Sequence, residues 1–227
     1  MSVKPVIELT ADGSHTLFVS GLNEHYHSVN GAVQESRHVF IKSGLYHCSL
    51  DDIYVFEVGF GTGLNAYLTL IESLKLNKIV HYISVEAYPL SDEIIRILNY
   101  TEGYSPDIQQ MFYAMHKATW NEEVSINENF FLTKIEADFV DFDFSLFQNT
   151  FNLIYFDAFA PDKQPAMWTQ DIFNSIYDIT AKNGILTTYC AKGVVRRMMQ
   201  QAGYTTERLP GPPGKREMLR AIRKSLF

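Results

Sequence analysis

Cysteine and long apolar runs are both scarce in this 227-residue chain. The two cysteines, Cys48 and Cys190, lie far apart and form no Cys-x-x-Cys pair, which argues against a disulfide framework and against a cysteine-ligated zinc site. No stretch reaches the roughly 18 consecutive apolar residues of a membrane span, and the N-terminus lacks the apolar region of a secretory signal. We therefore expect a cytoplasmic protein with reduced thiols.

The histidines do not suggest a metal site either. His25 and His27 share one strand face, but no Asp, Glu or further His completes a ligand set nearby in the sequence. Ser, His and Asp residues also form no recognisable nucleophilic arrangement. We expect no bound metal.

Positive charge is unevenly distributed along the chain. The formal net charge is −7, which argues at first against a nucleic-acid partner. Residues 182–227, however, contain ten Lys and Arg against two Glu, a net charge of +8, which leaves −15 for the rest. This split is compatible with a basic, phosphate-binding face on an acidic body. From charge alone, a solvated basic C-terminus is the simpler interpretation.

Two kinds of pattern divide the chain. Two short apolar runs flank Ala-Asp-Gly-Ser near the N-terminus, a hairpin signal, so we expect a β-rich extension over residues 1–50. From residue 51 to 227, strand-like runs alternate with helical patterns, which predicts one α/β unit with a mostly parallel sheet. The last two runs are separated by Pro-Gly-Pro-Pro-Gly and should pair as neighbours. We predict a Rossmann-like fold with a C-terminal antiparallel strand.

A glycine-rich loop follows the apolar run at residues 53–58. The dinucleotide fingerprint is Gly-x-Gly-x-x-Gly, whereas the spacing here is Gly-x-Gly-x-Gly, with Glu57 two residues before the first glycine. A carboxylate would repel a pyrophosphate, whereas the carboxylate, or the backbone that it orients, would favour the ammonium of an amino-acid moiety. The loop therefore favours S-adenosylmethionine over a nicotinamide cofactor. We expect this cofactor to contact Glu57, Gly59, Phe60, Gly61, Thr62, Gly63 and Asn65.

Carboxylates also end the next three parallel strands, where ligands bind in such sheets. Glu86 is suited to the ribose hydroxyls of either cofactor, and Asp138 to the adenine amino group or, equally, to capping a loop. Asp157 ends an apolar strand before a proline-marked turn. Because an unpaired buried carboxylate is costly, Asp157 is the first candidate for chemistry, with a cap or turn role as its alternative.

The most specific signals are FEVGFGTGLN (56–65), ISVEAYPL (83–90), FDAFAPDKQPAMWTQDIF (156–173) and GKREML (214–219). Together with the stretch from Glu35 to Phe40, these segments resemble the methyltransferase domain of the MnmC family of tRNA-modification enzymes. The similarity runs from about residue 17 to the C-terminus, and the block from Asp-x-Phe-x-Pro to Met-Trp is its most specific part.

The resemblance implies a class I S-adenosylmethionine-dependent methyltransferase. Its reaction would be N-methylation of 5-aminomethyl(-2-thio)uridine at the wobble position, in the tRNA anticodon loop. Bifunctional members of the family carry an FAD-dependent oxidoreductase domain after the methyltransferase domain, whereas this sequence ends at Phe227. We therefore expect a stand-alone form without FAD, to which upstream tRNA-modification enzymes supply the aminomethyl group.

The implied substrate suggests a role for Asp157. An alkyl amine has a pKa of about 10 and must lose a proton before it accepts a methyl group. We expect Asp157 to accept an N–H hydrogen bond and aim the lone pair, although it could also relay the proton.

The other substrate contacts would be aromatic and cationic. A wobble base lies in a single-stranded loop and can be splayed onto aromatic faces, although core packing is the ordinary role of such side chains. Positive side chains near the cofactor end of the sheet could bind phosphates. The candidates are Phe159, Pro161, Trp168 and Tyr189 for the base, and Lys192, Arg196, Arg197, Lys215 and Arg216 for phosphates.

Other functions remain open at this point. The glycine loop alone would equally permit a methyltransferase acting on a small molecule or a protein, because fold does not fix substrate. A non-catalytic cofactor-binding or RNA-binding module is disfavoured by the carboxylates at the strand ends, and an NAD oxidoreductase by the glycine spacing.

Overall fold

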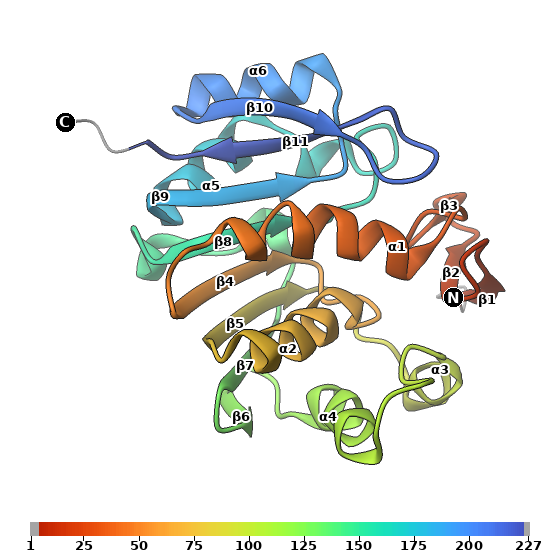
Figure 1. Cartoon of the computed structure of the whole chain (residues 1–227). Coiled ribbons are helices and arrows are strands. Elements are labelled where there is room, and N and C mark those ends of the chain that lie inside the picture. The colour runs from red at the N-terminus through yellow and green to blue at the C-terminus, as the bar shows by residue number, and fades with distance from the viewer. Residues whose placement is uncertain (1–4, 225–227) are drawn as a thin grey trace.

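The apolar runs between residues 52 and 222 form one eight-stranded sheet, with helices on both faces (Figure 1). The computed structural model describes residues 5–224. This arrangement confirms the predicted Rossmann-like α/β fold. In the order of the sheet, the strands are β10 (Thr205–Pro210), β11 (Glu217–Ile222), β9 (Thr180–Thr188), β8 (Phe151–Phe156), β4 (Asp52–Val58), β5 (Ile79–Glu86), β7 (Phe130–Glu136) and β6 (Glu123–Asn127).

Five neighbouring strands of this sheet, from β9 to β7, are parallel. Strand β11 pairs antiparallel with both β9 and β10, as the Pro-Gly turn predicted, and β6 pairs antiparallel with β7. Strand β6 is a short edge strand without buried residues, and no sequence pattern predicted it. Chain order reverses at β4, which lies between β5 and β8, so a crevice is expected at the carboxyl ends of β4 and β8.

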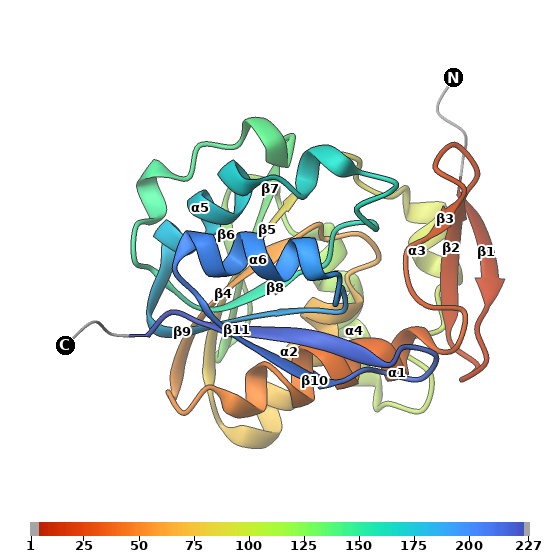
Figure 2. The same ribbon diagram turned by 90° about the horizontal axis from the view of Figure 1, so that it is seen from above.

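Helices cover the two faces of the sheet in separate groups. Figure 1 shows α1, α2 and α4 in front of the sheet, and Figure 2 shows α5 and α6 on the side away from α1 and α2. No helix within residues 5–224 is long and apolar enough to cross a membrane. The helices are α1 (Ala32–Ser36), α2 (Leu64–Leu76), α3 (Asp92–Ile97), α4 (Pro106–Lys117), α5 (Gln170–Ile179) and α6 (Gly193–Ala202).

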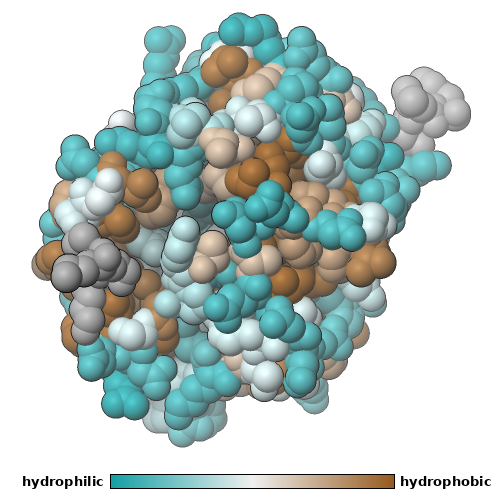
Figure 3. Space-filling model, turned by 180° about the vertical axis from the view of Figure 1, so that it is seen from behind, coloured by the Kyte–Doolittle hydropathy of each residue, from teal (hydrophilic) through white to brown (hydrophobic). Residues whose placement is uncertain are grey.

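The connection from β7 to β8 is made by two short 3-10 helices, η3 (Phe139–Asp141) and η4 (Ser145–Phe147). Aromatic side chains of this segment pack around Phe56 of β4, so the connection contributes to the core on its side of the sheet. Figure 3 views the molecule from behind and shows hydrophobic residues gathered near the middle of that face.

The N-terminal segment forms a small sheet beyond the carboxyl ends of the central strands (Figure 1). Its strands are antiparallel, and the hairpin around Ala-Asp-Gly-Ser is confirmed. They are β1 (Val6–Leu9), β2 (His15–Val19) and β3 (Glu24–His25).

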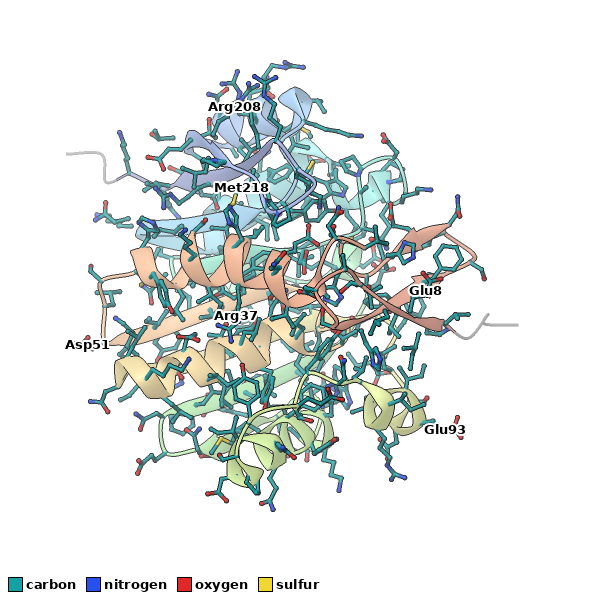
Figure 4. All side chains as sticks on the ribbon, turned by 45° about the vertical axis from the view of Figure 1, so that its right-hand side comes forward. Glu8, Arg37, Asp51, Glu93, Arg208 and Met218 are labelled. Carbon is teal, nitrogen blue, oxygen red and sulfur yellow. The ribbon has the colours of Figure 1, made fainter. Side chains whose placement is uncertain are left out.

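Residues 32–47 are helical and depart from the expected β-rich extension. After α1 come a π-helix, η1 (Arg37–Lys42), and a 3-10 helix, η2 (Leu45–His47). The helical turns bury Val39, Phe40 and Ile41 together, which a strand could not do on one face. Figure 4 shows Arg37 between this segment and α2, where its Nη1 lies 3.0 Å from Glu72 Oε1. A domain division at residue 50 stays a prediction.

Candidate active site

A cavity of about 320 Å³ opens where the crevice was expected, at the carboxyl ends of the parallel strands. This volume lies within the range of pockets for small ligands. The N-terminal segment contributes Tyr26 and His27 to its wall. Of the predicted site residues, the cavity is lined by Gly59, Phe60, Gly61, Thr62, Asn65, Glu86, Asp138, Asp157 and Phe159.

The glycine loop depends on backbone conformations that side chains rarely adopt. Gly59, Gly61 and Gly63 have φ angles of +86°, +50° and +72°. A Cβ atom would lie 3.1 Å from the Tyr26 ring if placed on Gly61, and 2.8 Å from His116 Nε2 if placed on Gly63. The loop therefore offers bare backbone to the cavity and leads directly into α2.

Two carboxylates beside the loop hold backbone groups as well as lining the cavity. Glu86 accepts hydrogen bonds from the backbone N–H of Gly61 at 2.9 Å and of Tyr88 at 2.7 Å, and so ties the glycine loop to the end of β5. Asp138 accepts from the Val140 N–H at 3.0 Å and caps η3. The sequence left capping and cofactor contact equally open for Asp138, and its position is compatible with both.

Glu57 lies in the interior behind the glycine loop and is not part of the cavity wall. Glu57 is 1% exposed to solvent, and its Oε2 atom has no hydrogen-bond partner. Burial raises the pKa of this carboxyl well above its usual value, which favours its neutral form. Because β4 directs this side chain inward, its position suits the alternative in which Glu57 orients the backbone of the glycine loop, and its contact with a cofactor stays a prediction.

Asp157 faces the glycine loop across the cavity, next to α2. Its Oδ2 accepts a hydrogen bond of 2.8 Å from the side-chain Nδ2 of Asn65. Burial raises the pKa of Asp157 to about 7; the negative charge of Glu35 adds to this rise, and Asn65 and Lys215 oppose it. A carboxyl with this pKa can exchange a proton near neutral pH.

The aromatic candidates differ in position. Phe159 lines the cavity, and its ring meets that of Tyr26 edge to face at 5.1 Å. Trp168 lies outside the cavity wall, as in the core-packing alternative: its indole is buried beside Phe156, and its Nε1 donates to the Phe159 carbonyl at 2.7 Å. Helix α5 begins just after Trp168, and the Trp168 side chain packs beneath the loop that carries Phe159, outside the cavity wall. Pro161 and Tyr189 also lie outside the cavity wall.

The cationic candidates differ in their ion pairs and in their exposure to solvent. Lys192 lies 2.5 Å from the exposed Asp162, and Lys215 lies 2.5 Å from the buried Glu35, so each already has an anionic partner. Lys215 thus belongs to the interior edge of the site, not to an outer basic rim. Arg197 and Arg216 are exposed, whereas Arg196 is half-buried.

Several residues of the site gave no signal in the sequence. Tyr26, His27 and His116 reach the glycine loop or cavity only through long-range packing. Glu35 stood in a stretch that matched the family, but without an assigned role. No group of three or more His, Cys, Asp or Glu within residues 5–224 could hold a metal ion.

The comparisons with known proteins agree with this geometry. A family model of S-adenosyl-L-methionine-dependent methyltransferases matches residues 104–224, more than half of the chain. The chain belongs to this family. The methyltransferase is 29% identical over 208 residues to the tRNA 5-methylaminomethyl-2-thiouridine biosynthesis bifunctional protein MnmC of Pseudomonas fluorescens, covering 86% of this chain and 31% of that protein. It is 27% identical over 209 residues to the same-named protein of Marinomonas, covering 85% and 30%.

The methyltransferase spans about a third of the length of these relatives. Among solved structures, MnmC2 from Aquifex aeolicus matches with a TM-score of 0.81 and 25% identity, covering 98% of this chain and 72% of that one. Spermidine synthase from Thermotoga maritima, at a TM-score of 0.53 and 12% identity, shares only the fold. These matches confirm the resemblance to the MnmC methyltransferase domain.

Proposed function

We propose that this methyltransferase N-methylates 5-aminomethyl(-2-thio)uridine at the tRNA wobble position. The observation that carries the proposal is Asp157, a carboxyl with a pKa of about 7 in the wall of the cavity opposite the glycine loop. Such a group suits an amine substrate, which must give up a proton. The relatives named for tRNA 5-methylaminomethyl-2-thiouridine biosynthesis support the choice of amine.

The residues of the cavity fit S-adenosyl-L-methionine, which supplies a methyl group on a sulfonium sulfur. The bare backbone of Gly59 and Gly61 leaves room for its amino-acid end. Glu86 uses one lone pair on each oxygen for backbone N–H groups, so both oxygens can still accept from ribose hydroxyls. Phe139 and Val140 offer an apolar wall for the adenine, with Asp138 at its edge.

Asp157 would prepare the amine for transfer. The substrate ammonium gives a proton to the Asp157 carboxylate, and the nitrogen then has a free lone pair. That lone pair forms the new N–CH₃ bond as the S–CH₃ bond breaks, and the bonding electrons remain on sulfur as a thioether. Because the pKa of Asp157 is raised, proton acceptance costs less than it would for an ordinary carboxylate. We therefore assign Asp157 both orientation and proton acceptance.

The tRNA would reach the cavity from the side of the N-terminal sheet. Phe159 and Tyr26 present aromatic rings at the cavity wall, where a splayed base can stack. Arg197 and Arg216 are exposed and form no ion pair within residues 5–224, and they would contact phosphates. Other tRNA-modification enzymes would supply the aminomethyl group.

The test is transfer of labelled methyl to tRNA that carries 5-aminomethyl-2-thiouridine. Wild type should label the wobble nucleoside, and Asp157→Ala should reduce the rate at least about 100-fold, as expected for loss of a general base. Cofactor affinity, measured by calorimetry, should stay within a few-fold. Asp171→Ala, an exposed carboxylate in the first turn of α5, is the matched control and should retain full activity.

Two outcomes would count against the proposal in different ways. If wild type binds S-adenosyl-L-methionine but leaves this tRNA unlabelled, the substrate assignment fails, and small molecules and proteins become the next substrates to test. If Asp157→Ala retains the wild-type rate, the substrate assignment stands and the role of Asp157 fails.

A further inference from the structure

Helix α1 reaches the active site through two consecutive side chains, Glu35 and Ser36. Both residues are buried, with exposed fractions of 7% and 1%. The helix has only five residues and follows directly on the N-terminal segment that lines the cavity. Each of the two side chains makes a contact that leads to Asp157.

Ser36 fixes the orientation of the Asn65 side chain. Its hydroxyl donates a hydrogen bond to Asn65 Oδ1. The amide nitrogen must then point the other way, and it donates to Asp157 Oδ2 at 2.8 Å. Without the Ser36 donor the amide could flip and turn its oxygen toward the Asp157 carboxylate, which would be repulsive. The direction of the Asn65 hydrogen bond thus depends on Ser36.

Glu35 holds Lys215 beside the same carboxyl. One oxygen of Glu35 accepts from the Ser28 backbone N–H at 2.7 Å, and the other lies 2.5 Å from Lys215 Nζ. The Lys215 ammonium sits 3.8 Å from the centre of the Tyr189 ring. The Tyr189 hydroxyl in turn donates to the carbonyl of Ala158 at 2.8 Å, one residue after Asp157. An ion pair between residues 180 positions apart is therefore built into the wall of the site.

We propose that Ser36 and the Glu35–Lys215 ion pair are positioning residues for Asp157. Ser36 orients the Asn65 amide that donates to Asp157, and the ion pair places two opposite charges beside it. The proposal rests on the role given above to Asp157 in the methyl-transfer reaction.

The Glu35–Lys215 ion pair supplies the charges that act on the Asp157 carboxyl. The titratable groups that face it are Glu57 from β4, Tyr82 from β5, Glu35 from α1, Tyr189 after β9 and Lys215 from the turn between β10 and β11. Burial raises the pKa of Glu57, Tyr82 and Tyr189, which favours the neutral form of each. The charges that act on the pKa of Asp157 are those of Glu35, which raises it, and Lys215, which lowers it.

Carbon-13 NMR of the Asp157 carboxyl tests the proposal in the cofactor-free protein, with Asp157→Asn to assign the signal. Lys215→Met should raise the titration midpoint and Glu35→Gln should lower it, each by about half to one pH unit, and the double variant should return near wild type. Ser36→Ala should raise the midpoint, because the donor from Asn65 is no longer fixed. Ser36→Thr keeps the hydroxyl and should leave the midpoint unchanged.

Opposite shifts separate positioning from loosened packing. A loosened site admits water, which lowers a pKa that burial has raised, so every variant would then shift downward. Downward shifts throughout, or no shift in Lys215→Met, would overturn the proposal. Lys215→Arg keeps the charge and Lys182→Met changes an exposed lysine at the start of β9, so both should match wild type. If Glu35→Gln does not fold, the comparison of Lys215→Met with Lys215→Arg still tests the proposal.

The titration needs no substrate and so separates the two proposals. If the midpoints shift as expected while tRNA stays unlabelled, the positioning role stands and the proposed function fails. If tRNA is methylated, the acidic limb of the kcat profile against pH should move with the NMR midpoint in each variant.

Discussion

At the scale of single residues, the surroundings of a carboxyl group decide what it can do. Glu86 accepts two backbone N–H groups and anchors the glycine loop. Asp157 accepts one side-chain hydrogen bond and has a pKa raised by burial to about 7. Glu57 is fully enclosed, with one oxygen unpartnered. Three acidic residues at neighbouring strand ends are thus an anchor, a group that can exchange protons and an interior side chain whose burial favours the neutral form.

The neutral state of Glu57 can be tested with Glu57→Gln. Because the folded-state pKa is raised, the stability that Glu57 contributes is complete below its unfolded pKa of 4.5 and is lost as pH rises toward the folded value. Gln cannot ionise, so the variant should gain about 1.4 kcal/mol over wild type for each pH unit in that window. Urea unfolding between pH 4 and pH 8 measures the difference.

The same variant tests the role that the sequence suggested for Glu57. If Glu57 is an interior group, Glu57→Gln should bind S-adenosyl-L-methionine within a few-fold of wild type. A stability difference that stays constant with pH, together with a loss of cofactor affinity, would instead identify an ionised carboxylate that contacts the cofactor.

At the scale of elements, α4 and β7 support the glycine loop from behind. His116 of α4 shares a hydrogen bond of 3.1 Å with the Thr62 carbonyl, and burial lowers the pKa of its imidazole to about 4, so the ring is neutral. The buried Lys134 of β7 donates to the His116 carbonyl at 2.7 Å, and its ammonium lies 4.5 Å from the Trp120 ring centre. The conformation of the loop therefore depends on residues more than 50 positions away.

Gly63→Ala should show this dependence. The new Cβ would lie 2.8 Å from His116 Nε2, and the φ angle of +72° is strained for alanine. We expect a loss of about 2 kcal/mol or more in the free energy of unfolding and about tenfold weaker cofactor binding. Denaturant titration and calorimetry with S-adenosyl-L-methionine measure the two effects.

Two further variants separate the two causes of the stability loss in Gly63→Ala, which are backbone strain and the collision with His116. Gly103→Ala introduces alanine at a similar φ of +81°, with no atom within 4 Å of the new Cβ, so it should cost the backbone strain alone, about 1 kcal/mol. In Gly63→Ala/His116→Ala the collision is absent, so the double variant should lose less stability than the two single variants together. Additive losses would show that His116 does not contact the loop in solution.

The elements that the sequence predicted are those set by local patterns. Strands β4, β5, β7 and β8 are apolar runs that end at turns or carboxylates, and the hairpin of β1 and β2 has a local turn signal. The segment around Phe40 is different, because its apolar run suits a strand or a helix, and burial against α2 decides for the helix.

The residues of the candidate site also differ in whether local sequence patterns predict them. Asp157, Glu86 and the glycines follow from their places at strand ends, whereas contacts such as Lys215 with Glu35 join distant parts of the chain. The sequence left two positions open for Trp168, because an aromatic residue near a motif has the same sequence signal in a core as in a pocket, and the structure places its side chain in the core.

At the scale of the whole molecule, several positive side chains of the basic segment, residues 182–227, form ion pairs. Arg208 pairs with Glu217, Arg220 with Glu207, Lys192 with Asp162 and Lys215 with Glu35. The net charge of +8 already subtracts Glu207 and Glu217, so only the pairs of Lys192 and Lys215, whose acidic partners lie outside residues 182–227, reduce the charge open to a polyanion further. Within residues 5–224, the exposed side chains of Arg197 and Arg216 form no ion pair, and both follow loops at the cavity end of the sheet.

Charge reversal at these two arginines should weaken tRNA binding without affecting the cofactor. Arg197→Glu/Arg216→Glu should lower tRNA affinity about tenfold or more, and should reduce the slope of log affinity against log salt by roughly 0.7 to 0.9 for each phosphate that the variant no longer neutralises. Filter binding between 50 and 200 mM salt, on the order of physiological ionic strength, measures both quantities.

Lys182→Glu is the matched control for this prediction. Lys182 belongs to the same basic segment and is exposed, but it lies near the start of β9, at the end of the sheet away from the cavity. If tRNA approaches the cavity end, Lys182→Glu should keep nearly the wild-type affinity and salt slope. An equal loss in both variants would mean that tRNA responds only to overall charge, since a directed approach requires the two arginines at the cavity end of the sheet to matter more.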